Sequence, residues 1–272
     1  IIKDSQKYVP EFLEDIIEKN INSINFIKTP NDCLPLFNGA SSIKLNQIEK
    51  YLENLKPDNK VNNLGGLFKI KYKSHFILMD VDRPPQKKFS KSYQSGPLSF
   101  EYFLDGIKII TNSGFGFQIS NKAEQLSRLT ACQSTLTIND TSITKFEKNK
   151  MINRVFGNSI QDSFKSFDFS SKNEDRLIGC SASNNGYEKE FGCTHKREIY
   201  IDKEKNYLIG KDHIFKAKDG YPIRYAFRFH INPEHNLIKT KRKNRALIQS
   251  SKNKSLLFTT HEEDLEIEKS IF

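Results

Sequence analysis

The chain has 272 residues, of which 36% are hydrophobic, and this suits one large domain or one domain with part of another. The formal net charge is +10, but lysines are spread along the sequence, and the one dense run is KTKRKNR at 239–245. A nucleic-acid binder would cluster such charge, so we expect no nucleic-acid partner. Diffuse positive charge suits an acidic ligand such as a polyuronate, with biased base composition as the alternative explanation.

The four cysteines, Cys33, Cys132, Cys180 and Cys193, form no CxxC pair and no zinc-binding spacing. Cys180 and Cys193 flank a predicted hairpin, where a disulfide is conceivable, but free buried thiols are favoured. No apolar run approaches the ~20 residues that span a membrane. Ile1 opens the chain without Met or a charged leader region, so we expect no signal peptide and a start that has been cut.

The first elements are predicted to be helical. Residues 8–28 carry apolar side chains at helical spacing: Val9, Phe12, Leu13, Ile16, Ile17, Ile21 and Ile24. A second, short helix is predicted from Lys44 to Leu55. Because a helix cannot bury such a stripe alone, the first helix must pack on a sheet or on a further helical partner.

From residue 67 onward the hydrophobic period changes to two, which predicts antiparallel strands and hairpins. A hairpin should turn near Lys73 and Ser74, and another at Asp105-Gly106. A hairpin tip is expected at 239–245 and a long loop over the sheets at 147–172. The strands are predicted within 67–82, 98–103, 107–114, 134–139, 176–183, 190–202, 207–217, 223–232, 246–251 and 255–261. Turn residues recur at the spacing of a β-sandwich.

Several stretches in this order carry a family resemblance: LPLFNG (34–39), MDVDRPP (79–85), FSKSYQSGPLSFE (89–101), IITNSG (109–114), LTACQSTLTINDTS (129–142), NNGYEKEFGCTHKREIYID (184–202) and YAFRFHINP (225–233). The chain resembles the C-terminal portion of the heparinase II/III-like polysaccharide lyases, especially the alphaproteobacterial branch. The resemblance implies a mainly β fold: residues 1–58 would be the helical end of an α/α toroid, and residues 59–272 an antiparallel layered β-sandwich.

The resemblance also implies a reaction, the β-elimination of a uronate-containing acidic polysaccharide. One group neutralises the uronate carboxylate, a base removes the C5 proton, and an acid protonates the leaving O4. The base tyrosine and the carboxylate-neutralising Asn of the family lie in the toroid, so an upstream α/α toroid domain is the expected partner. The family's substrates usually lie outside the cytoplasm, which implies a periplasmic or cell-envelope location.

The chain departs from the family at residues that would handle protons. Gln94, Gln133 and Asn184 stand where relatives usually or often carry histidines, and Asn112 stands where some place a metal-binding Asp. An amide can donate and accept hydrogen bonds, but it cannot shuttle a proton or offer a good metal-binding nitrogen. We therefore expect no metal and no cofactor. Gln94 thus occupies a position that the resemblance marks as catalytic, but its side chain cannot perform acid–base catalysis. Gln133 and Asn184 become candidate substrate-binding residues.

Five other residues are candidates for the site. Tyr93 could protonate a leaving group, although packing at the sandwich edge is the simpler explanation. His195 matches a retained family position, but a sheet-facing His is more often structural. Alternation along 225–231 would place Arg224, Arg228 and His230 on one outward face, where arginines could bind an anionic sugar, or which could simply be a solvated strand face.

Two functions from different classes follow. The first is a polysaccharide lyase of this family, present here as its C-terminal portion. The second is a non-catalytic module that binds acidic glycan or supports the cell envelope, keeps the fold and has lost the chemistry. The three amide replacements favour the second function more than the family resemblance alone does.

Overall fold

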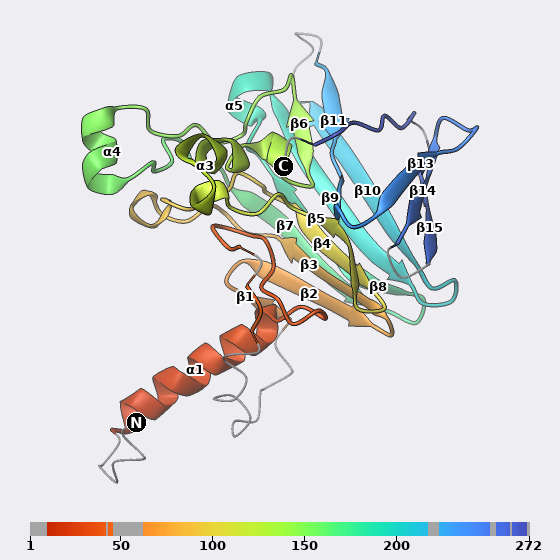
Figure 1. Cartoon of the computed structure of the whole chain (residues 1–272), viewed down its shortest axis with the longest axis horizontal. Coiled ribbons are helices and arrows are strands. Elements are labelled where there is room, and N and C mark those ends of the chain that lie inside the picture. Colours follow the sequence, from red (N-terminus) through yellow and green to blue (C-terminus); the bar gives the residue numbers. More distant parts are fainter. Residues whose placement is uncertain are drawn as a thin grey trace.

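The protein is built mainly of antiparallel strands stacked in layers, with short helices gathered at one end of them (Figure 1). This computed structural model describes residues 10–41, 43–45, 62–216, 223–250, 254–261 and 263–270. The mainly β, antiparallel sandwich predicted from the two-residue period is confirmed.

The first sheet has six strands in the order β1-β2-β3-β4-β5-β12. Both predicted hairpins are present in it, and Lys73 and Gly106 have the positive φ that their tight turns require. The bounds are β1 (Asn63–Leu64), β2 (Leu67–Tyr72), β3 (His75–Asp80), β4 (Phe100–Leu104), β5 (Ile107–Thr111) and β12 (His230–Ile231).

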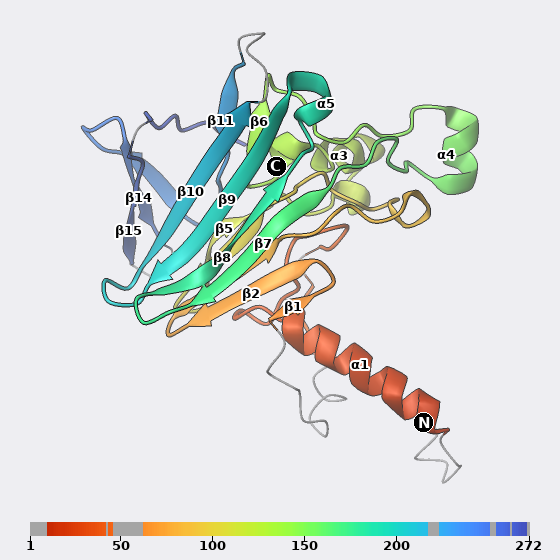
Figure 2. The same cartoon turned by 180° about the vertical axis from the view of Figure 1, so that it is seen from behind.

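The second sheet has four strands in the order β10-β9-β8-β7 and faces the viewer in Figure 2. Its bounds are β7 (Ser166–Asn173), β8 (Leu177–Asn184), β9 (Cys193–Asp202) and β10 (Tyr207–Lys216). The prediction of a long loop over 147–172 is wrong, because this segment holds helix α4 (Lys150–Phe156) and most of β7. β7 was missed because it is an exposed edge strand whose apolar alternation is limited to Phe167 and Phe169, followed only by polar residues.

Two smaller sheets extend the sandwich. β6 (Leu136–Ile138) pairs with β11 (Tyr225–Phe227), and a three-stranded sheet holds β13 (Asn236–Lys239), β14 (Arg245–Gln249) and β15 (Ser255–Thr259). The basic run 239–245 connects β13 to β14, so the predicted hairpin tip is confirmed. The other helical elements are η1 (Lys87–Phe89), η2 (Gly116–Gln118), α3 (Asn121–Ser127), η3 (Thr130–Cys132) and α5 (Glu188–Phe191).

The main hydrophobic core lies between the two large sheets. Its buried members come from β2 to β5 on one side and from β8 and β9 on the other, with Ile248 of β14 closing one end. Since the chain has no Trp and only 2 Met, branched aliphatic and phenyl side chains fill this space. Ile77, Met79, Leu98, Cys180 and Ile201 are all fully buried.

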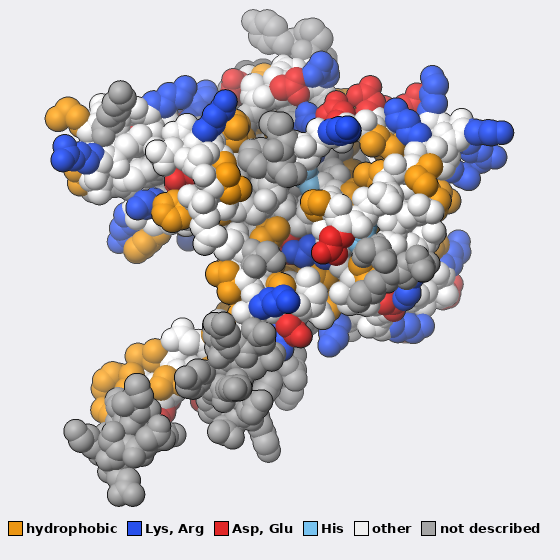
Figure 3. Space-filling view, viewed as in Figure 1, with side chains coloured by type: hydrophobic (Ala, Val, Ile, Leu, Met, Phe, Trp, Pro, Cys, Tyr) orange, Lys and Arg blue, Asp and Glu red, His pale blue; other side chains and the backbone are white. Residues whose placement is uncertain are grey.

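Helix α1 (Glu11–Ile27) confirms the first predicted helix and projects from the sheets at the end of the molecule near β1 and β2 (Figures 1 and 2). Only Ile21 and Phe26 of its apolar face are buried, whereas Phe12 is 64% exposed. Figure 3 shows hydrophobic side chains along this helix. The second predicted helix, from Lys44 to Leu55, and the predicted domain boundary at 58/59 fall almost wholly outside the described residues.

All four cysteines are free and buried. Cys180 lies opposite Ile199 in the β8–β9 ladder, so it does not face Cys193, and the favoured prediction of free thiols is confirmed. Within the described part of the chain, no helix combines the length and the apolar character needed to cross a membrane.

The sheet packing gives a direct test with two leucines. Leu78 of β3 is fully buried, whereas Leu257 of β15 is 58% exposed. Leu78→Ala should lower the free energy of unfolding by about 2–5 kcal/mol, because it removes buried methyl groups and leaves a cavity. Leu257→Ala should change it by less than about 0.5 kcal/mol. Urea denaturation followed by circular dichroism measures both, and equal losses would contradict the burial of Leu78 in the cluster with Phe26 and Phe103 on the outer face of the first sheet.

Candidate functional site

Gln94 lies on the loop between η1 and β4 and is 2% exposed. Its Nε2 donates to the carbonyl oxygens of Gly114 at 2.7 Å and Ser127 at 3.0 Å, and its Oε1 accepts from the Gly39 amide at 3.1 Å. One side chain therefore joins two loops and the end of helix α3, which lie 20 to 55 residues away in the sequence. The donors and the acceptor of this amide are therefore used within the protein.

Gln133, on the loop between η3 and β6, lies beside Gln94. It is 1% exposed, and its Nε2 donates at 2.9 Å to the same Ser127 oxygen that Gln94 uses. Gly96 fits closely against it, since a Cβ on Gly96 would lie 2.8 Å from Cγ of Gln133. The structure thus brings the two predicted site amides together, but in a buried position.

Arg197 of β9 connects the backbones of these two loops. Its Nη1 donates to the carbonyl oxygens of Leu98 at 2.9 Å and Ser134 at 2.6 Å. Leu98 has a φ of +59°, a conformation that is costly for a branched side chain. The Arg197 guanidinium also pairs through Nε and Nη2 with Asp212 of β10, at 2.7 and 3.1 Å. A fully buried arginine therefore fixes the start of β4 against the start of β6.

His195 shares the same carboxylate. Its Nε2 lies 2.7 Å from Oδ1 of Asp212, while its Nδ1 is buried without a partner among the described residues. Burial lowers the pKa of His195, and the ring is therefore neutral at pH 7. Burial alone would raise the pKa of Asp212, but the Arg197 charge and the bonds from His195 and Arg197 hold it well below its usual value. His195 is placed as a buried partner of this ion pair.

Asn184 ends β8 directly opposite His195 in the ladder and is 1% exposed. Its Oδ1 accepts from the Gly186 amide at 3.0 Å, which closes the turn after the strand. Its Nδ2 is buried with no hydrogen-bond partner within the described chain. Cross-strand pairing therefore places two predicted site residues together, both beneath the surface.

The predicted basic face is only partly present. Arg224 and Arg228 both pair with Asp140, and Arg228 also reaches Glu268 at 3.5 Å. His230 does not share their exposed face, because its Nε2 contacts the Ala131 carbonyl at 3.0 Å. The single strand predicted here is interrupted: β11 ends at Phe227 and β12 begins at His230, so the alternation on which the prediction depended is lost. Burial lowers the pKa of His230.

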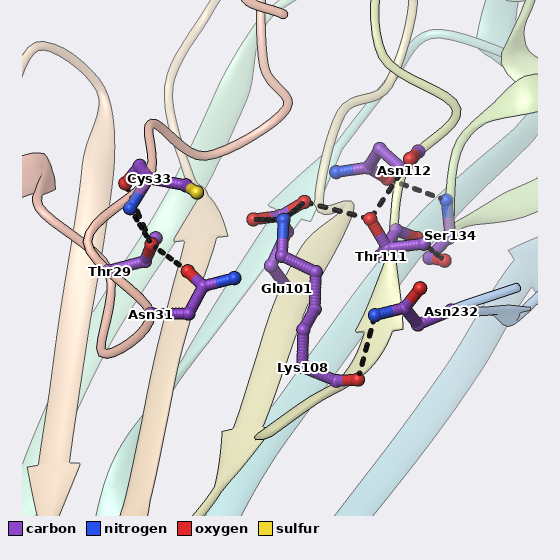
Figure 4. Close-up of polar contacts among 9 residues, drawn as sticks. All are labelled: Thr29, Asn31, Cys33, Glu101, Lys108, Thr111, Asn112, Ser134 and Asn232. Carbon is purple, nitrogen blue, oxygen red and sulfur yellow. Dashed lines mark hydrogen bonds and ion pairs between the residues drawn. The ribbon is translucent and has the colours of Figure 1, made fainter. Parts of the chain in front are cut away.

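Asn112 belongs to a buried polar cluster on β4, β5 and the loop before β6 (Figure 4). Its Oδ1 accepts from the Ser134 amide at 2.9 Å. The Glu101 carboxylate accepts hydrogen bonds from Lys108 Nζ at 3.0 Å and from the Thr111 hydroxyl at 3.0 Å. The Glu101–Lys108 ion pair is therefore buried but hydrogen-bonded. These contacts fix the end of β5, and they leave Asn112 in a structural role beside the two glutamines.

A cavity of about 480 Å³ opens next to the Gln94 loop. Tyr93 lines it, together with Asp80 at the end of β3 and Arg83 and Phe89 from the connection that follows. Burial raises the pKa of Tyr93 well above its ordinary value, and the nearby Asp80 adds to the rise. Burial likewise raises the pKa of Asp80 from 3.8 to about 7. The phenol is thus a neutral donor at pH 7, and the carboxyl titrates near neutrality.

Reasoning from the sequence identified Tyr93 but missed Asp80 and the Arg197–Asp212 pair. The signal for the pair was available in part: a turn at 203–206 sets Arg197 opposite Asp212 in the β9–β10 hairpin. Asp80 could have been noticed as a carboxylate that directly follows the apolar run 76–79. Across the residues that the structure describes, no group of three or more His, Cys, Asp or Glu is arranged to hold a metal ion.

A layered antiparallel sandwich with the motif loops at one end is the class of fold that the sequence resemblance implied. The family described as heparinase II/III-like, C-terminal, matches residues 55–272, and the chain belongs to this family. No curated protein matches the sequence significantly.

Solved structures of lyases share the fold. A mutant of heparan sulfate lyase HepC from Pedobacter heparinus superposes with a TM-score of 0.70 at 16% identity, over 94% of this chain and 41% of the lyase. Another structure, named heparinase III, gives a TM-score of 0.64 at 14% identity, over 92% of this chain and 41% of that one. The chain therefore spans about two fifths of the length of these enzymes.

The Arg197 contacts predict a large loss of stability. Arg197→Met should lower the free energy of unfolding by about 3–5 kcal/mol, because Asp212 and two carbonyl oxygens would remain buried without their donor. Arg176→Met is the matched control: Arg176 also pairs with an aspartate, but its side chain is 57% exposed, so the loss should be much smaller. Urea denaturation compares them, and a small loss for Arg197→Met would contradict its role.

The raised pKa of Asp80 predicts that replacing this residue increases the stability of the folded chain in a pH-dependent way. The folded chain keeps the Asp80 proton up to about pH 7, whereas the unfolded chain releases it near 3.8, so wild-type stability falls as pH rises between these values. Asp80→Asn removes this loss and should be more stable than wild type by roughly 2–4 kcal/mol at pH 8, with no gain at pH 4.

The exposed Asp175 supplies the control for this experiment. Asp175→Asn should differ from wild type by a similar small amount at both pH values. Thermal or urea unfolding at pH 4 and pH 8 gives the four differences. An Asp80→Asn gain that is independent of pH would show that the carboxyl titrates normally.

Proposed function

We propose that the chain is the C-terminal, β-sandwich portion of a polysaccharide lyase that cleaves uronate-containing acidic polysaccharide by β-elimination. The observation that carries the proposal is Tyr93, whose raised pKa keeps a proton available on the wall of a cavity beside the Gln94 loop. Membership of the heparinase II/III-like family supports it, as do similar folds named as heparan sulfate lyases. The net charge of +10 favours an acidic polymer.

In β-elimination, the C5–H and C4–O4 bonds break and a C4–C5 double bond forms. We assign Tyr93 the protonation of the departing O4, because a neutral phenol can donate and its pKa is too high for it to act as the base at neutral pH. The base would come from an α/α toroid upstream of this portion. The exposed apolar residues of α1, among them Phe12 and Ile16, support such a helical partner. We place the protein in the periplasm or cell envelope, where such polymers occur.

The second candidate function is a non-catalytic module that binds acidic glycan. It is favoured by Gln94 and Gln133, because neither amide can transfer a proton and both donate to a backbone carbonyl. Arg224, the most exposed arginine of the predicted basic face, would then meet the polymer in place of Asp140.

The test uses the full-length protein with several polyuronates and follows the ultraviolet absorbance of the unsaturated uronate product. Tyr93→Phe should lower kcat by about 100-fold or more, with little change in KM, because it removes the acid and keeps the ring. Tyr207→Phe, on a 43% exposed tyrosine that is not among the cavity-lining residues, should leave kcat unchanged. In the chain 1–272 alone, Gln94→His should produce no activity.

The two candidate functions give different outcomes. Product from any polymer, lost in Tyr93→Phe, supports the lyase. Measurable binding without product from any polymer would exclude the lyase and leave the binding module. Product formation by the isolated Gln94→His chain would show that the base does not lie upstream.

A further inference from the structure

The cavity that contains Tyr93 has the features of a built binding site. Its wall combines Asp80 from the end of β3, Asn38 from the loop after α1, and Arg83, Phe89 and Tyr93 from the β3–β4 connection. Its volume of about 480 Å³ lies in the range of roughly 300–1,000 Å³ found for small-molecule sites. In Figure 1, the β3–β4 connection runs toward the end of the molecule that holds α3 and α4.

Two polar groups point to a ligand there. Asp80 is 7% exposed, and its Oδ1 accepts one long bond, from the Asp82 amide at 3.3 Å, while its Oδ2 accepts none within the described chain. Tyr93 is 3% exposed, and its hydroxyl makes no hydrogen bond to any described residue. Both atoms open onto the cavity and are not sealed in the interior, so the carboxyl and the phenol are free to bond hydroxyl groups of a ligand.

The charges of the cavity favour one class of sugar. Asp80 and Asp82 contribute two carboxyl groups and Arg83 one guanidinium, so the lining does not favour a second carboxylate. Below pH 7 Asp80 is protonated and can both donate and accept, which matches a sugar hydroxyl. Phe89 at the rim is 68% exposed and offers a flat apolar surface to a sugar ring.

We propose that this cavity is a subsite for a pyranose unit that carries hydroxyl groups and no acid group, with Asp80 contacting its hydroxyls, Phe89 packing on its ring and Tyr93 facing the O4 that joins it to the uronate. The proposed function enters only in the identity of the polymer to which this unit belongs. In that polymer, the subsite would hold the uncharged sugar next to a uronate. The assignment deepens the proposed function, because it makes Asp80 and Phe89 determinants of which polymer is accepted.

The test is a titration of the ¹⁵N-labelled chain 1–272 at pH 6 with N-acetylglucosamine and, separately, with glucuronate, followed by amide chemical shifts. N-acetylglucosamine should shift the amides of Gly65, Gly66 and Ser92, which line the cavity, and should bind at least fivefold more tightly than glucuronate. Phe89→Ala should weaken this binding at least fivefold.

Phe117→Ala is the matched control, since Phe117 is 67% exposed and is not among the cavity-lining residues. It should leave the affinity unchanged, and the exposure of both side chains lets both variants fold. Shifts at other amides, equal or tighter binding of glucuronate, an equal effect of both variants, or no binding at all would each overturn the subsite. Lyase activity of the full-length protein would then still stand, because it is measured by product formation and not by binding in this cavity.

Discussion

The arrangement of the site loops depends on the buried guanidinium of Arg197. It links the carbonyl oxygens of Leu98 and Ser134, which lie 99 and 63 residues away in the sequence, to a carboxylate on the neighbouring strand. A charge removed from water is tolerated only when its hydrogen bonds are satisfied, and these contacts with Asp212 and two carbonyls provide that. The interaction therefore selects one arrangement of the loops and offsets the strained backbone at Leu98.

The two glutamines extend this arrangement. A histidine at either position could carry a proton, whereas Gln94 and Gln133 both donate to the Ser127 carbonyl and hold the loops together. Their effect is to rigidify the wall beside the cavity. The groups able to change protonation state are instead Tyr93 and Asp80, on the adjacent surface, where burial sets both pKa values. The two amides thus have a structural role that is separate from any acid–base role of the groups nearby.

Helix α1 has a different relation to the sandwich. Phe26 at its end packs with Phe37, Phe76 and Phe103 on the outer face of the first sheet, while its earlier turns extend away with apolar residues exposed. The family match begins at residue 55, after this helix. The helix is therefore anchored on the sheet at its last turn and leaves apolar side chains exposed along its earlier turns.

The sequence by itself determined the type and order of most elements. Alternation at 67–82 and at 98–112, with turn-forming residues between, was sufficient to predict the hairpins, because a two-residue period with one buried face allows only one register. The ordered motif stretches were sufficient to predict the family. Edge strand β7 escaped prediction because it has no buried face to impose a period.

Only the tertiary structure decided what the site residues do. Gln94 and Gln133 were visible in the sequence, but their burial depends on Gly39 and Gly114 from two distant loops and on Ser127 at the end of α3. The pairing of Arg197 with Asp212, the inward turn of His230 and the cavity at Asp80 likewise arise from contacts between segments far apart in the chain. Local sequence determines whether a residue lies on a strand, but hydrogen-bond partners and solvent access are set by what packs against that strand, and so are the pKa values that follow from them.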